Sequence, residues 1–162
     1  MFVRTASERD LGAIRTLLVE TWHATYDPIY GEERVTEITD EWHSIEALRP
    51  RLSRPNSEFL IADDGKRIGG VAFAEAIDGG RSIVLRQLYV LPPLQGRGIG
   101  GMLLDEVIES FPEASAIRLE VEERNARAIA FYTANGFVPS GETGEHSGTG
   151  APTLIYSRNL AG

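Results

Sequence analysis

The chain has 162 residues, 42% of them apolar, which favours a single domain over residues 1–162 with an ordinary hydrophobic core. Its 24 acidic and 16 Lys or Arg side chains give a formal net charge of −8, which argues against nucleic acid as a partner. No apolar run could span a membrane, no leader-like segment is present and cysteine is absent, so we expect a cytoplasmic protein without membrane contact, disulfides or an acyl-cysteine intermediate.

Turn-forming residues and apolar periodicity divide residues 1–90 into helical regions and strands. Asp27-Pro28 and Gly31 break the chain after the first helix, and Pro50 interrupts or bends the second helical region. The expected elements are a strand from Phe2 to Thr5, a helix from Ser7 through Glu20, a helical region capped by Ser44, and strands from Glu58 to Ala62, Arg67 to Ala76 and Ser82 to Val90.

The second half of the chain continues the alternation of helices and strands. Asn135-Gly136 is a common left-handed helix stop. The expected elements are a helix from Ile99 to Phe111, a strand from Ala116 to Val121, a helix from Ala126 to Ala134, a strand begun by Phe137 to Pro139, a polar loop from Gly141 to Gly150, and a strand from Thr153 to Ser157. This order predicts an α/β fold with a mixed sheet.

The glycine-rich stretch Gln95-Gly96-Arg97-Gly98-Ile99-Gly100-Gly101 is the most informative part of the chain. It joins the strand that ends at Val90 to an amphipathic helix. Because glycines carry no side chains, several backbone N–H groups stand open beside the positive end of the helix dipole. A plain turn needs only one or two glycines, so the pattern favours a bound anion, above all a phosphate.

Two other phosphate-binding motifs must be compared with this stretch. Gly96 to Gly101 also matches the G-x-G-x-x-G fingerprint of dinucleotide-binding proteins, with Glu120 where a ribose-binding acid would follow. Against that reading, Pro92 to Gln95 separate the strand from the glycines, hairpins precede it, and too little chain follows for more parallel strands. A Walker A loop is excluded because no Gly-Lys-Ser or Gly-Lys-Thr follows.

Gln95 to Gly100 resembles the Q/R-x-x-G-x-G/A pattern of the GNAT superfamily of N-acetyltransferases, whose loop holds the pyrophosphate of acetyl-coenzyme A. Leu88 to Pro93 resembles the family's preceding strand end. Asn125 to Tyr132 resembles its second signature, and Asn135 to Phe137 the usual continuation. The signatures occur in matching order and spacing, and the resemblance covers Ile68 to Val138.

The resemblance implies a mixed, mostly antiparallel central sheet of about seven strands flanked by about four helices. It implies acetyl-coenzyme A as cosubstrate and an amine, of a small molecule or a peptide, as the acceptor that attacks the thioester directly in a ternary complex. The absence of cysteine suits this direct route. Family members often form dimers, so a homodimer is compatible, although no segment of the sequence marks an interface.

The resemblance also assigns cofactor contacts by position. Leu88 and Val90 would offer backbone groups to the pantetheine arm, and the Val90 N–H would face the thioester carbonyl. Asn125 would hydrogen-bond that arm, and capping of its own helix is a second role compatible with the first. The residues around the pyrophosphate would be Gln95, Gly96, Arg97, Gly98, Gly100 and Gly101.

Tyr132 is the candidate general acid, because a phenol stays protonated at neutral pH and can give its proton to the departing thiolate. Core packing beside Phe131 is the alternative role. The general base stays open, because Arg86-Gln87 stands where many family members place a carboxylate. Glu75, Glu120 and Glu122 are substitutes that could act through water, and a solvated strand end is the alternative for each. The three histidines are too widely spread to predict a metal site.

The acceptor pocket is expected between the first two helices and the loop at 141–150. Aromatic side chains there can line a pocket or hold a cation over a ring, and they can equally form core. The segment is also acidic, which suits a primary amine or a peptide amino group. The aromatic candidates are Trp22, Tyr26, Tyr30 and Trp42.

Two rival functions stay open on sequence. A non-catalytic coenzyme A-binding sensor would keep the fold and lose the chemistry, and the missing strand carboxylate favours it. A nicotinamide-dependent oxidoreductase would follow from the literal glycine fingerprint.

Overall fold

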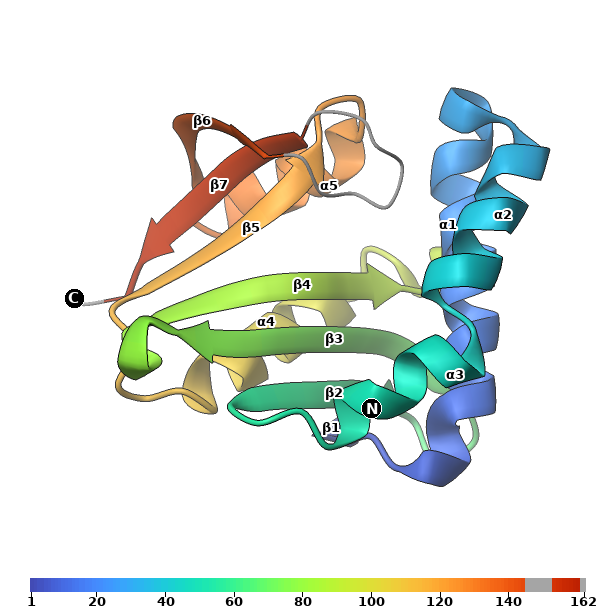
Figure 1. The fold of residues 1–162 in the computed structure, drawn as a ribbon, viewed down its shortest axis with the longest axis horizontal. Helices are drawn as coiled ribbons and strands as arrows, with labels where there is room; N and C mark the ends of the chain where they lie inside the picture. The colour runs from blue at the N-terminus through green and yellow to red at the C-terminus, as the bar shows by residue number, and fades with distance from the viewer. Residues whose placement is uncertain (145–152, 161–162) are drawn as a thin grey trace.

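The computed structural model describes residues 1–144 and 153–160, which form one seven-stranded sheet with helices on both faces (Figure 1). The strands are ordered β1-β2-β3-β4-β5-β7-β6, and only the β4–β5 pair among the described strands is parallel. The strands are β1 (Phe2–Thr5), β2 (Ser57–Asp63), β3 (Ile68–Ile77), β4 (Ser82–Val90), β5 (Ala116–Glu122), β6 (Val138–Gly144) and β7 (Thr153–Asn159).

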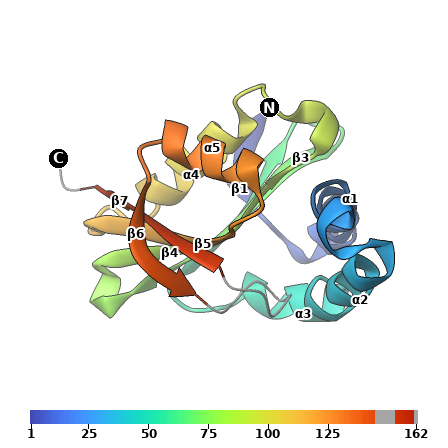
Figure 2. The same cartoon turned by 90° about the horizontal axis from the view of Figure 1, so that it is seen from above.

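Helices α4 (Ile99–Glu109) and α5 (Ala126–Ala134) lie on one side of the sheet, and α1 (Leu11–Tyr30), α2 (Glu32–Trp42) and α3 (Ile45–Leu48) lie on the other (Figure 2). The main core includes Ile14 and Leu18 of α1 and Leu103 of α4, all fully buried. The predicted mixed, mostly antiparallel sheet is confirmed. Five α-helices accompany it within residues 1–144 and 153–160, one more than expected, since α2 was not anticipated.

The centre of the sheet opens where β4 and β5 diverge (Figure 1). The two strands pair only from Ser82 with Ala116 to Leu85 with Leu119. A register shift in the β3–β4 ladder leaves Arg86 as an extra residue on β4, opposite the step from Phe73 to Ala74. Such a bulge bends its strand and increases the local twist, so β4 turns away from β5 after Leu85.

Helix α1 runs ten residues beyond the expected end at Glu20, through Pro28 to Tyr30. The prediction of a break at Asp27-Pro28 is therefore wrong. Proline lacks only one hydrogen bond in the last turn of a helix, and the buried side chains of Trp22 and Tyr26 hold that turn against the protein. The helix ends at Gly31, whose φ of 88° is poorly tolerated by other residues.

Two further segments differ from the expectations. Helix α2 buries Val35, Ile38 and Thr39 on one face, and this short apolar stripe was hidden among acidic residues. Gly141 to Gly144 belong to strand β6 and not to a loop, because β6 pairs with β7 up to Gly144 opposite Thr153. Residues 145–150 of the expected polar loop lie outside the described part of the chain.

The Ser44 cap is confirmed, since its hydroxyl accepts from the Ala47 N–H at 3.1 Å.

Candidate active site

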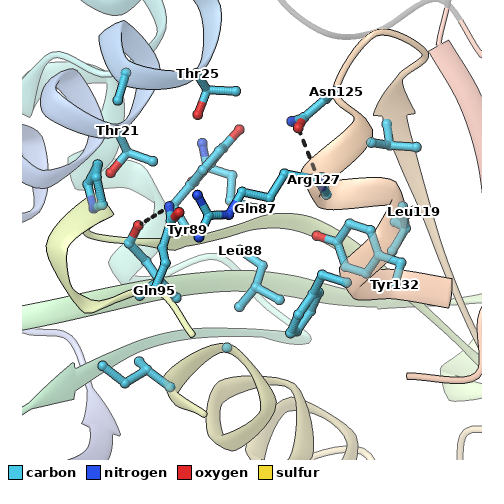
Figure 3. Close-up of a pocket in the computed structure, with 18 of the residues that line it drawn as sticks. Thr21, Thr25, Gln87, Leu88, Tyr89, Gln95, Leu119, Asn125, Arg127 and Tyr132 are labelled. Carbon is cyan, nitrogen blue, oxygen red and sulfur yellow. Dashed lines mark hydrogen bonds between the residues drawn. The ribbon is translucent and has the colours of Figure 1, made fainter. Parts of the chain in front are cut away.

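A pocket of about 900 Å³ occupies the opening between β4 and β5 (Figure 3). Its walls come from α1, the second half of β4, the glycine loop, β5 and α5. It therefore joins segments that are more than a hundred residues apart in the sequence, from Thr21 to Asn135.

Strand β4 turns backbone groups that no neighbouring strand pairs with toward this pocket. The Leu91 N–H donates to the Gly69 carbonyl of β3 at 2.9 Å. Because backbone groups alternate sides along an antiparallel strand, those of Leu88 and Val90 point away from β3, toward the place that β5 has left. Both residues line the pocket. They can offer strand-like hydrogen bonds to an extended ligand.

The glycine loop forms one end of the pocket, at the start of α4. Gly96 and Gly98 have φ values of 82° and 85°, a region that side chains rarely adopt, and a Cβ on either would meet only open space. Gly98 is the N-cap of α4, so the first N–H groups of the helix face the pocket without a side-chain cap. This arrangement suits an anion.

Gly100 has a different role from its neighbours. A Cβ there would lie 2.9 Å from Cε1 of Phe131, so this glycine allows α4 and α5 to approach closely. Gly101 lines the pocket and has open space around it. Gln95 donates from its amide to the Val90 carbonyl at 3.0 Å, which fixes the loop to the strand end. Arg97 is exposed and is not among the lining residues.

Helix α5 supplies Asn125 and Tyr132. Asn125 caps the helix, accepting from the Ala128 N–H at 3.2 Å, and its amide donates to the Tyr26 hydroxyl at 3.3 Å. Tyr132 packs edge-on between Phe131 and Phe137, and its hydroxyl points into the pocket (Figure 3). Burial raises the pKa of Tyr132 far above its ordinary value, and the nearby Tyr26 adds to the shift. The phenol therefore stays protonated at any ordinary pH.

The three candidate carboxylates lie in different environments. Glu120 lines the pocket, and its carboxylate accepts from the Thr153 hydroxyl at 3.3 Å. Glu75 does not line the pocket. It lies near the end of β3, where it forms ion pairs with Arg54 and Arg86. Two guanidinium groups therefore already occupy the Glu75 carboxylate.

Glu122 is almost fully buried and accepts from the Tyr30 hydroxyl at 2.9 Å and from Arg124 Nε at 2.8 Å. Burial alone would raise the pKa of Glu122, but the hydrogen bonds from Arg124 and Tyr30 outweigh it and lower that pKa. Glu122 does not line the pocket. Its geometry is that of a tether between α1 and the turn after β5.

The four aromatic candidates do not form one surface. Tyr26 lines the pocket, whereas Trp22 lies in a second core cluster with Val35 and Ile38. Tyr30 is bound to Glu122 and lies under the Arg124 guanidinium, 5.0 Å from the ring centre. Trp42 is 46% exposed and away from the lining residues. The acidic side chains of α2 also lie outside the pocket wall.

The comparisons agree with this geometry. Residues 13–137 match the sequence model of the Acetyltransferase (GNAT) family. The chain belongs to the GNAT family. It is 30% identical to the peptidyl-lysine N-acetyltransferase YiaC of Escherichia coli, over 83% of this chain and 82% of the relative. It is 29% identical to a spermidine N(1)-acetyltransferase of Thermoplasma acidophilum, over 83% and 86%.

The fold of this GNAT chain also matches a solved structure. The crystal structure of PaiA N-acetyltransferase from Thermoplasma acidophilum in complex with coenzyme A superimposes with a TM-score of 0.84. The match has 25% sequence identity and covers 98% of each chain. The predicted family and the acyltransferase class are thus confirmed. Within the described residues, no helix is both long and apolar enough to cross a membrane.

Several pocket residues of this GNAT chain were not anticipated from the sequence. Thr21 and Thr25 are one helical turn apart on α1, and the expected helix end at Glu20 concealed them. The Thr21 hydroxyl is buried without a hydrogen-bond partner among the described residues. Arg127 follows the N-cap of α5 and projects into the pocket (Figure 3). The remaining unanticipated residues with charged or amide side chains are Arg86, Gln87 and Arg124.

Proposed function

We propose that this chain is an acetyl-coenzyme A-dependent N-acetyltransferase that moves an acetyl group to an amine by direct attack in a ternary complex. One observation carries the proposal: a single pocket runs from the bare start of α4, along the free edge of β4, to the Tyr132 phenol. The pocket matches the three parts of the cosubstrate. The diphosphate needs N–H donors, the pantetheine arm needs strand-like partners, and the thiolate needs a proton.

The residues fit the cosubstrate at each of these parts. Gly96, Gly98 and Gly101 leave the loop open to a diphosphate, and Arg127 adds positive charge to the wall. Leu88 offers free backbone groups and Val90 its N–H, which is suited to stabilise the developing oxyanion. Gln95, Gly100 and Asn125 support these groups through the Val90 carbonyl, the α4–α5 contact and the α5 cap. Arg97 can contribute to diphosphate binding from the exposed side of the loop.

The reaction requires two proton movements. The amine nitrogen forms a bond to the thioester carbon, the carbon–sulfur bond breaks, and the nitrogen loses one proton while the thiolate gains one. Tyr132 is suited to protonate the thiolate, since its raised pKa keeps it protonated. Glu120, the one carboxylate among the described lining residues, is suited to accept the amine proton through water. Glu75 and Glu122 are less suited because arginines already bind them.

The acceptor is an amine of a small molecule or a peptide. The names of the relatives point to such groups, a polyamine in one and a lysine side chain in the other. Tyr26 borders the acceptor region directly, and Tyr30 supports it from the end of α1. A role for Trp22 there would be indirect, through packing against Tyr26 at a ring-centre distance of 4.5 Å.

Release of free thiol from acetyl-coenzyme A in the presence of an amine panel tests the proposal. The chain has no cysteine, so a thiol reagent detects coenzyme A alone. Amine-dependent thiol release supports the transferase. Tight binding of acetyl-coenzyme A with no release for any amine would favour the sensor, which the Arg86-Gln87 replacement on β4 supports.

A thermal-shift comparison of acetyl-coenzyme A with nicotinamide cofactors addresses the oxidoreductase. The described strands contain one parallel pair, whereas dinucleotide-binding folds use a largely parallel sheet, so we expect a shift with acetyl-coenzyme A alone. The cytoplasmic location and the homodimer stay predictions from the sequence and the resemblance.

A further inference from the structure

A chain of polar side chains lies behind β4, beside the acceptor end of the pocket. Arg51 donates from Nη1 to Gln87 Oε1 at 2.6 Å, and the Gln87 amide nitrogen lies 3.4 Å from His43 Nδ1. Arg51 also donates to the Trp42 carbonyl at 3.2 Å and stacks 5.7 Å from the Phe73 ring centre. Of Arg51, Gln87 and His43, only Gln87 lines the pocket.

The chemistry of these groups fixes which end of the amide is free. A guanidinium has donors and no acceptor, so the Gln87 oxygen must face Arg51 and the NH₂ group must face the other way. One N–H of that group is directed at His43 Nδ1, over a long distance for a hydrogen bond. Burial and the nearby Arg51 lower the pKa of His43 to about 3, so the imidazole is neutral, and Nδ1 accepts in the tautomer that is protonated at Nε2.

The surroundings of Gln87 carry positive charge. Arg51 lies directly behind it, and Arg86 precedes it on the pocket wall. Glu75 balances Arg86 only in part, because it is shared with Arg54. No carboxylate among the described residues hydrogen-bonds to Gln87. An ammonium group would meet only an N–H donor and a guanidinium here, which do not bind it. A carbonyl or carboxylate oxygen would meet a hydrogen-bond donor.

We propose that Gln87 determines acceptor specificity: its amide N–H, oriented by Arg51, binds a carbonyl or carboxylate oxygen of the acceptor at a distance from the reacting amine. Gln87 lies three residues from Val90 on β4, about 10 Å along a strand. That separation suits an extended lysine-type side chain, with its terminal amine at the thioester and its backbone oxygen at Gln87. The inference rests on the proposed function and narrows its acceptor class.

Matched acceptors test the inference without changing the protein. Lysine and Nα-acetyl-lysine methylamide both carry the oxygen, as a carboxylate and as an amide carbonyl. Cadaverine is lysine without its carboxyl group, and spermidine is a longer amine that also lacks the oxygen. We expect kcat/KM for the better of the two lysine compounds to exceed that for cadaverine at least about tenfold, the effect of one hydrogen bond to a partly buried donor.

Variants then assign the preference to Gln87. In Gln87→Leu the lysine-to-cadaverine ratio should fall toward one, mainly through a higher KM for the lysine compound. Arg51→Met should lower the ratio as well, because the amide is then free to turn its oxygen toward the pocket. Arg54→Met is the matched control: it removes a neighbouring arginine that contacts Glu75 and not Gln87, and the ratio should stay high.

The outcomes separate this inference from the proposed function. Turnover of cadaverine or spermidine as efficient as that of both lysine compounds would overturn the inference and leave the transferase intact. A ratio that survives in Gln87→Leu would do the same. No thiol release with any amine would reject the transferase and the inference together. A higher rate with free lysine than with the methylamide would identify a carboxylate as the source of the oxygen, and the reverse order a peptide carbonyl.

Discussion

The cofactor end and the acceptor end of the pocket are built in different ways. In the proposed function, the cofactor end comes mainly from residues 88–101, a strand edge and a glycine loop that offer backbone groups, and α5 adds Asn125 and Arg127. The acceptor end brings together side chains from α1, the turn after α3, β4 and β5. Backbone recognition depends on glycines at fixed spacing, which a sequence displays. Side-chain recognition depends on which distant residues meet, which only the fold displays.

The largest effect is expected at the glycine loop, with Gly98→Val. A β-branched residue at a φ of 85° is strained, and its side chain would enter the open space beside the first N–H groups of α4. We expect the affinity for coenzyme A to fall by about a hundredfold or more, since several hydrogen bonds to charged oxygens are lost together. Calorimetric titration with coenzyme A measures the loss.

Gly65→Val is the matched control for that experiment. Gly65 has a φ of 94° and equally open surroundings. It lies in the β2–β3 turn and is not one of the residues that line the pocket. Both variants should lose similar stability in thermal melts, and only Gly98→Val should lose binding. Equal binding by the two variants would remove the loop from the cofactor site.

Tyr132→Phe tests whether the Tyr132 phenol acts as the general acid. We expect kcat to fall by about a hundredfold with little change in coenzyme A affinity, because the ring still packs between Phe131 and Phe137. Because the pKa of Tyr132 is raised, its deprotonation should cause no alkaline loss of rate within the usual assay range. Tyr156→Phe, at a buried tyrosine outside the pocket lining, should leave kcat unchanged. Equal losses in kcat and affinity would refute the acid role.

Glu120→Gln examines the base on the acceptor side. Loss of a base that acts through water should lower kcat by about tenfold or more at neutral pH. Glu75→Gln offers the contrast, since that carboxylate is held by Arg54 and Arg86 outside the pocket wall. Its loss should lower the melting temperature more than the turnover. If the Glu75 variant lost turnover and the Glu120 variant did not, the assignment of the base would be reversed.

The contrast between the two ends also explains what the sequence could predict. Strand β4 and helix α5 were predicted at their observed bounds, because the Asp78-Gly79-Gly80 turn before an apolar run in one and the Asn125 and Asn135-Gly136 signals in the other are local. Helix α1 was predicted too short, because the cost of Pro28 is local while its compensation by the buried Trp22 and Tyr26 is tertiary. Local signals thus sufficed where local physics decides the structure.

The candidate site followed the same division. The loop glycines were found by their spacing and the strand edge through the family resemblance, and their geometry suits the proposed roles. Strand alternation could not separate Glu75 and Glu122 from Glu120. What separates them is their ion pairs, because Arg54 and Arg86 bind Glu75 and Arg124 binds Glu122. Gln87 was noted only as a missing carboxylate. Its orienting partner Arg51 lies 36 positions away and no sequence pattern links the two.

A different effect, on the pH dependence of stability, is expected from His43 behind the acceptor end. The pKa of His43 is lowered to about 3 by burial and by Arg51, against 6.5 for an unperturbed imidazole. Between these values the unfolded chain binds a proton that the folded chain does not, so stability falls as the pH drops. The loss approaches about 1.4 kcal/mol per pH unit for one such group.

His43→Gln removes that dependence, and denaturant unfolding at a series of pH values measures it. The variant should show a shallower decline of unfolding free energy between pH 6.5 and 3 than the parent chain. His23→Gln is the control, because His23 is half-exposed beside Asp27 and has no comparable burial. Identical slopes for the parent chain and His43→Gln would mean that His43 accepts a proton in the folded state, and the neutral acceptor at Nδ1 would be lost from the account of Gln87.

The smallest effect is expected from Tyr30→Phe, which removes the hydrogen bond between the end of α1 and Glu122. The Tyr30 hydroxyl joins the last turn of α1 to buried Glu122. The Asn125 amide, at the start of α5, also donates to the Tyr26 hydroxyl of α1. Removing the hydroxyl leaves Arg124 on the carboxylate, so Glu122 keeps one charged partner and the fold should survive. The end of α1 should then move more freely against β5, which raises the acceptor KM about threefold, the effect of one partly compensated hydrogen bond. Coenzyme A affinity should stay constant, because neither Tyr30 nor Glu122 is among the described residues that line the pocket. A parallel loss of both constants would show that the acceptor wall and the cofactor groove respond as one unit, contrary to their separate construction.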